Sequence, residues 1–117
     1  MASIKQFEDL EIWKRARVQA KACYGLSKLA YDEKDFELAN ALPKTSGSVM
    51  DNIAEGFGRG GNKEFSQFLS IAYASSTELK SQLYRLSDRP YCETDLKEVL
   101  SECEAIKNQI NAFMMYL

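Results

Sequence analysis

The chain contains no histidine, which is the side chain that most often acts as a general acid or base near neutral pH. The Glu-x-x-His motif that holds the ions of di-metal helical bundles is therefore also absent. The three cysteines, Cys23, Cys92 and Cys103, form no CxxC pair and are odd in number, which argues against a structural zinc site and a disulfide framework. We expect no metal, no cofactor and no catalytic residue, and we interpret Cys23 and Cys103 as small buried residues.

Long apolar runs and strand patterns are lacking as well. No stretch approaches the ~20 apolar residues of a membrane span, and the first six residues lack the apolar core of a secretory signal. No alternating pattern predicts a β-strand. The chain has 117 residues, of which 45% are hydrophobic and 27% charged. These values suit one soluble domain over residues 1–117, for which we expect a cytoplasmic location.

Helical periodicity is what the sequence has instead. Apolar or small residues recur every three or four positions in segments that we place at about 8–29, 36–56, 63–88 and 95–115. The third segment has the clearest seam, which is made of Phe65, Leu69, Ala72, Ser76, Leu79, Leu83 and Leu86. Four such helices with mostly short connections predict an all-α protein, an antiparallel up-down-up-down four-helix bundle.

The inward face of the first segment and the helix ends can be predicted too. The first helix is expected to bury Trp13, Ala16, Ala20, Tyr24 and Ser27. Three residues are suited to cap the second, third and fourth helices, namely Asp35, Asn62 and Thr94. Pro43 lacks an amide proton, so we expect a kink or a short break in the second helix.

The middle of the chain, residues 52–65, holds four of the six glycines. A glycine-rich stretch can cradle a phosphate, but here no strand precedes it and no Gly-Lys-Ser/Thr follows it, so a nucleotide site is excluded. We interpret the stretch as a helix end closed by Gly56 or Gly58, a turn, and a new helix start.

Charge and apolar residues outside the seams provide the candidate contact sites. Lys14, Arg17 and Lys21 share one stripe of the first helix, which is either a solvated face or an anion-binding ridge. With two cations of the central turn they form the candidate RNA-binding or partner-binding set, which is Lys14, Arg17, Lys21, Arg59 and Lys63. The net charge of -2 and the pI of about 5.2 weigh against nucleic-acid binding.

Three apolar residues of the third segment lie off its seam and are candidates for a subunit contact: Phe68, Ile71 and Tyr73. Scattered surface hydrophobes are the alternative interpretation. The net charge of successive segments alternates in sign, basic over 1–31 and 59–92 and acidic over 32–58 and 93–117. This alternation places basic helices beside acidic ones in the predicted topology, although exposed pairs contribute only a few tenths of a kcal/mol each.

Three stretches carry a resemblance to a known family: residues 7–14 (FEDLEIWK), residues 52–60 (NIAEGFGRG) and residues 63–72 (KEFSQFLSIA). Together they resemble the four-helix-bundle proteins encoded in 23S ribosomal RNA intervening sequences, over roughly residues 7–115. That family is similar to the accessory variability protein of diversity-generating retroelements, a pentameric barrel that binds RNA and a reverse transcriptase. The family usually has two arginines where Pro43 and Lys44 stand here, so this chain carries less basic charge.

The resemblance implies a homo-oligomer, with five copies by analogy, and a role that is not established. Our first hypothesis is a non-catalytic scaffold whose partner is a protein or an RNA. The alternative is an RNA-binding accessory protein that acts through a basic surface, together with a reverse transcriptase. We expect no membrane contact and identify no small-molecule substrate.

Overall fold

The computed structural model describes residues 3–117, so Met1 and Ala2 of the expected 1–117 domain lie outside the described residues. A short 3-10 helix, η1 (Phe7–Asp9), precedes four long helices, which are α1 (Glu11–Asp32), α2 (Phe36–Gly58), α3 (Asn62–Ser87) and α4 (Lys97–Tyr116). Residues 3–117 contain no strand. The predicted all-α four-helix bundle with antiparallel neighbours is confirmed.

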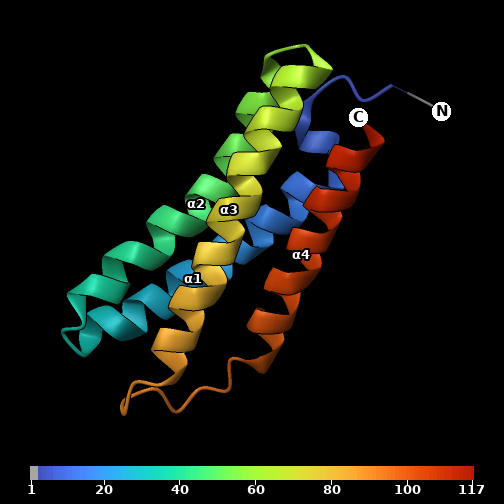
Figure 1. Cartoon of the computed structure of the whole chain (residues 1–117). Coiled ribbons are helices and arrows are strands. Elements are labelled where there is room, and N and C mark those ends of the chain that lie inside the picture. Colours follow the sequence, from blue (N-terminus) through green and yellow to red (C-terminus); the bar gives the residue numbers. More distant parts are fainter. Residues whose placement is uncertain (1–2) are drawn as a thin grey trace.

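The bundle is elongated, with extents of 48 × 21 × 19 Å. Figure 1 shows the α2–α3 turn at one end, near the start of the chain and its C-terminus, and the α1–α2 and α3–α4 connections at the other end. Helix α2 packs most closely on α1 and α3, whereas among neighbouring long helices α1 and α4 touch least. The seam between α1 and α4 is therefore the most open one of the bundle.

The core has two clusters, one towards each end. Ile53, Leu69 and Ile110 belong to the cluster near the α2–α3 turn, and Leu38 and Leu83 to the cluster near the α3–α4 connection. All five are fully buried, and burial of each such side chain contributes ~1.5–3 kcal/mol before the entropy cost of ordering it. The whole seam predicted for the third helix is buried.

The start of α2 agrees with its prediction and the start of α3 does not. Asp35 caps α2, because its Oδ1 accepts a hydrogen bond from the Leu38 amide at 3.4 Å. Asn62 was expected to cap α3 but is its first helical residue, and the cap position is held by Gly61 without a side-chain hydrogen bond. In the turn between these helices the left-handed glycine is Gly60, with φ 85°, rather than one of the two glycines expected there.

One further expectation about a helix end is wrong, and the second helix is continuous at Pro43. Thr94 does not cap α4, because the loop runs on to Leu96 before the helix begins, and the neighbouring Asp95 accepts from the Lys97 amide at 2.9 Å. Of the kink or short break expected at Pro43, the break does not occur, since α2 continues as one helix from Phe36 to Gly58. Its contacts with α1 and with α3 stabilise α2, whose local helix propensity is low.

Candidate interaction surfaces

The predicted basic stripe lies on the exposed side of α1. Lys14 forms an exposed ion pair with Glu11, with 3.4 Å between Nζ and Oε1. The Arg17 guanidinium lies 5.6 Å from the centre of the Trp13 ring, which is a cation–π contact. Lys21 is exposed and has no ion pair within residues 3–117. These cations therefore face solvent side by side and are only weakly neutralised.

The other two predicted cations flank the α2–α3 turn. Arg59 pairs with Glu55 at 3.0 Å and lies 5.0 Å from the centre of the Phe68 ring. Lys63 is exposed in the first turn of α3. No hydrogen bond or ion pair connects either residue with the α1 stripe in the described part of the chain. The five predicted residues are therefore two separate groups.

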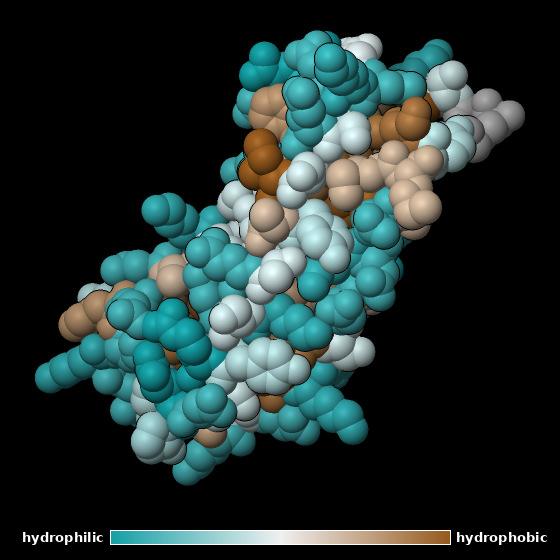
Figure 2. Space-filling view, viewed as in Figure 1, coloured by the Kyte–Doolittle hydropathy of each residue, from teal (hydrophilic) through white to brown (hydrophobic). Residues whose placement is uncertain are grey.

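The candidate subunit-contact residues of α3 are not brought together. Phe68 packs under Arg59 against α2. Tyr73 is partly buried against the core cluster shared with α4, and Lys107 Nζ lies 5.2 Å from its ring centre. Only Ile71 is exposed, at 48%. Figure 2 shows that hydrophobic groups on the α3–α4 side gather towards the end with the termini, while the rest of this side is mostly hydrophilic.

A second apolar surface lies where α1 ends and α2 begins, and the sequence pattern did not predict it. Tyr24, Tyr31 and Phe36 are 59%, 62% and 50% exposed. The rings of Tyr31 and Phe36 contact each other edge to face, with centres 5.4 Å apart. Tyr24 was predicted to be buried, and this is wrong: the buried face of α1 is turned away from it, towards residues such as Gln19 and Cys23. The helical period alone allowed α1 to be turned about its axis with either Tyr24 or Cys23 facing the core.

An open groove between α1 and α4 was also missed. Arg15 joins the two helices, because its Nε donates to Glu102 Oε1 at 2.8 Å and its Nη1 to Gln109 Oε1 at 3.0 Å. Beyond this bridge a cavity of about 580 Å³ opens towards solvent between the helices. Its α1 wall includes Val18, which is 68% exposed, and Leu26.

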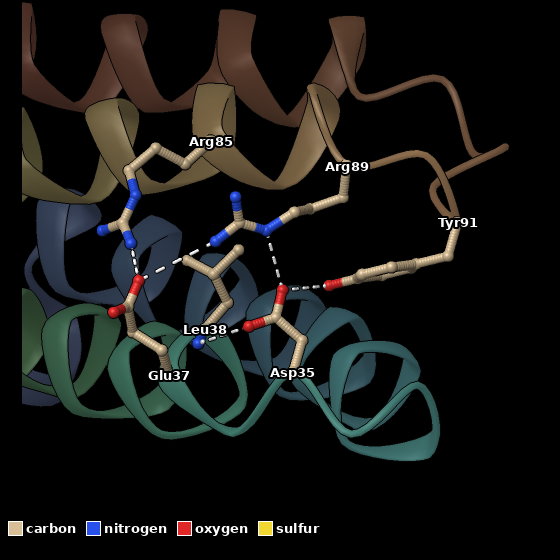
Figure 3. A network of polar contacts seen from close by, with 6 residues as sticks. All are labelled: Asp35, Glu37, Leu38, Arg85, Arg89 and Tyr91. Atoms are coloured by element: carbon tan, nitrogen blue, oxygen red, sulfur yellow. Dashed lines mark hydrogen bonds and ion pairs between the residues drawn. The ribbon is translucent and has the colours of Figure 1, made fainter.

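The most connected polar network is shown in Figure 3 and ties the α1–α2 turn to the start of the α3–α4 connection. Asp35 Oδ2 accepts hydrogen bonds from Arg89 Nε at 2.9 Å and from the Tyr91 hydroxyl at 2.6 Å. Arg85 and Arg89 both face Glu37 at the edge of this network. Burial works against ionisation of Asp35, but the donors outweigh it and hold its pKa below the ordinary value. The network joins the α1–α2 turn, α2, α3 and the α3–α4 connection.

The surroundings of the two buried thiols make them unreactive. Cys23 and Cys103 are fully buried, as predicted. Burial is the main cause that raises the pKa of Cys23 to about 12, and it also raises the pKa of Cys103. The described residues contain no group of three or more Cys, Asp or Glu side chains placed to hold a metal ion. Among the same residues, no helix is long and apolar enough to cross a bilayer.

The packing of these helices defines the class of the protein, an all-α four-helix bundle. The family model described as 23S rRNA-intervening sequence protein matches residues 8–112. The chain therefore belongs to the 23S rRNA-intervening sequence protein family, as its sequence motifs predicted. No curated protein and no solved structure matched the chain.

Proposed function

We propose that this member of the family is a non-catalytic scaffold that acts by self-association, with five copies as the expected number. The observation that carries this proposal is the exposed aromatic surface formed by Tyr24, Tyr31 and Phe36. Aromatic side chains bury a large area at a small entropy cost and are enriched at protein interfaces. The lack of histidine supports a role without catalysis, because the commonest general base is missing.

Light scattering on the purified chain tests this proposal. The monomer has a mass of 13.3 kDa, so a larger species at micromolar concentration is expected. A Tyr31→Asp/Phe36→Asp variant should give the monomer mass. Phe36 is the first residue of α2, where an acidic side chain suits the helix dipole, whereas Tyr31 lies in the last turn of α1, where it does not. Circular dichroism of the variant therefore checks that the helices persist. A monomeric wild-type chain would contradict the proposal.

Matched control variants on α3 test whether the subunit contact is confined to the aromatic surface. Ile71→Asp and Tyr84→Asp each put a charge on an exposed apolar residue of α3, at 48% and 52% exposure. Both variants should keep the wild-type mass. Dissociation by Ile71→Asp, with no effect of the aromatic pair, would assign self-association to α3 instead.

RNA binding is the second candidate function, and the observation that favours it is the solvent-facing stripe of Lys14, Arg17 and Lys21. Phosphate contacts by such cations make affinity fall steeply as salt rises. A Lys14→Glu/Arg17→Glu/Lys21→Glu variant should lose binding to a structured RNA at low salt. Arg59→Glu/Lys63→Glu tests the cations of the turn separately. If wild-type protein does not bind RNA at low salt, this candidate is rejected.

A further inference from the structure

The groove between α1 and α4 is a surface apart from the aromatic surface used in the proposal above. It lies along one long side of the bundle. One end is at the Arg15–Glu102 bridge, and the other is at Thr94 and Asp95, near the end of the α3–α4 connection. From Arg15 to Leu26 its α1 wall rises about 17 Å, which is roughly three helical turns. The groove thus has the length of a short helix.

The walls of the groove are apolar. Val18, Ala22 and Leu26 line it from α1, and Leu96 and Val99 from the α4 side. The three α1 residues are spaced four apart, so they form a continuous strip along that helix. Grooves of this kind between two helices accept the apolar face of a third amphipathic helix.

Gln19 is the unusual residue of this groove. Its side chain lines the cavity and is only 2% exposed, yet neither its amide nitrogen nor its amide oxygen has a hydrogen-bond partner. The Cys103 thiol is its polar neighbour: Gln19 opposes the rise of the Cys103 pKa that burial causes, but no hydrogen bond of normal geometry joins the two side chains. A buried amide left unpaired is unfavourable. Both amide atoms are buried, so an occupant of the groove pairs with them once the Gln19 side chain turns outward, and the chain then gains a donor and an acceptor.

The two rims of the groove carry opposite charge. Lys14, which forms an exposed ion pair with Glu11, lines the α1 rim, and Lys21 lies exposed further along the same stripe, just outside the lining. Asp95 and Glu98 line the α4 rim. An occupant that fits both rims is acidic along one edge and basic along the other, because each edge then faces the opposite charge.

We infer that the α1–α4 groove docks an amphipathic helix of another protein. The helix has an apolar face, acidic side chains on the edge beside α1, basic side chains on the edge beside α4, and an amide side chain opposite Gln19. A polar pair of this type inside an apolar seam fixes register and partner choice, as a buried asparagine does in coiled coils.

Synthetic 16-residue helical peptides test the inference by fluorescence anisotropy. The residues on the groove-facing side of each peptide are, in order, Leu, Ala, Asn, Ala and Leu. The first peptide has one acidic and one basic edge, and two controls have two acidic or two basic edges. A helix can enter a groove in either direction, so like-charged edges are a stricter control than exchanged edges. Wild-type protein should bind the mixed peptide about fivefold more tightly than either control, as two exposed ion pairs would give.

Charge reversal in the protein should move this preference. The Lys14→Glu/Lys21→Glu variant has two acidic rims and should prefer the peptide with two basic edges. Equal affinity of the folded wild-type chain for all three peptides, or no binding at all, would overturn the inference. Val18→Glu places a charge in the apolar wall at an exposed position and should abolish binding without changing the oligomer mass. A change in mass would assign the groove to a second copy and would also overturn the inference.

Gln19→Leu separates recognition from folding. This variant removes an unpaired buried amide, so its unfolding midpoint should rise. The affinity of this variant for the peptide with asparagine should fall at least tenfold. A peptide with leucine in place of the asparagine should bind the variant more tightly than it binds the wild-type protein. An unchanged order of the two peptides would show that the amide takes no part in docking, against the inference.

Discussion

Gly56 of α2 lies so close to Phe68 of α3 that a Cβ atom at Gly56 would stand 2.6 Å from the Cβ of Phe68. The same atom would stand 3.0 Å from Cδ1 of Phe65. These contacts explain the glycine in the central motif by helix packing, since α2 and α3 can approach this closely only without a side chain there. The motif that identifies the family therefore sets the distance between two helices.

Gly56→Ala should destabilise the fold by about 1–3 kcal/mol, because both nearby atoms belong to the base or ring of packed side chains and cannot move aside freely. Gly47→Ala is the matched control on the same helix. No atom lies within 4 Å of its added Cβ, so it should stabilise by about 0.5–1 kcal/mol through helix propensity. Urea unfolding of both variants measures the difference, and equal effects of the two would contradict the packing explanation.

Asp35 should be the most sensitive polar residue. Asp35→Ala removes the cap of α2 and leaves Arg89 and Tyr91 without their acceptor, so we expect a loss of about 2–3 kcal/mol in the free energy of unfolding. Tyr91→Phe should lose about 1 kcal/mol. Asp32→Ala, at an exposed neighbouring position, should change stability by less than about 0.5 kcal/mol. A similar loss in Asp32→Ala would show that the cap and network have no special role.

The same carboxyl makes stability depend on pH in the acid range. The folded pKa of Asp35 is lowered: burial opposes the shift, but the hydrogen bonds of Tyr91 and Arg89 prevail. A lowered folded pKa gives stability that is present above the unfolded value of about 4 and is lost as pH falls through the folded value. Unfolding midpoints between pH 6 and pH 2 should fall more steeply in the wild type than in Asp35→Asn. Parallel curves would rule out this carboxyl as the cause.

Thiol labelling should distinguish the three cysteines. Cys92 is partly exposed in the α3–α4 connection, whereas Cys23 and Cys103 are fully buried. Because the thiolate is the reactive form, burial and the pKa of about 12 should protect Cys23 in the folded chain. Ellman's reagent should modify one thiol quickly and the other two only in denaturant. Cys92→Ser should remove the fast phase, and a remaining fast phase would show that a core thiol is accessible.

The heptad seam of α3 could be predicted from sequence because its spacing leaves one buried face, and the structure buries all of it. The first helix was harder. Its residues Tyr24 and Cys23 lie on neighbouring faces, and the sequence pattern placed Tyr24 inside although it is exposed. The cap at Asp35 was predictable from residue type, but Asn62 and Thr94 were not used as caps because the chain reaches α3 and α4 through Gly61 and Leu96.

By itself the sequence determined the number and approximate extent of the helices, the family, and the lack of histidine chemistry, because these follow from local periodicity, residue type and motif. The tertiary structure decided which flank of each helix found a neighbour. It placed Gly56 against Phe68, left Tyr24 on the surface, and opened the groove beside Gln19. The physical reason is that a helical period fixes which residues share a face, whereas the approach of one helix to another depends on contacts between residues far apart in the chain.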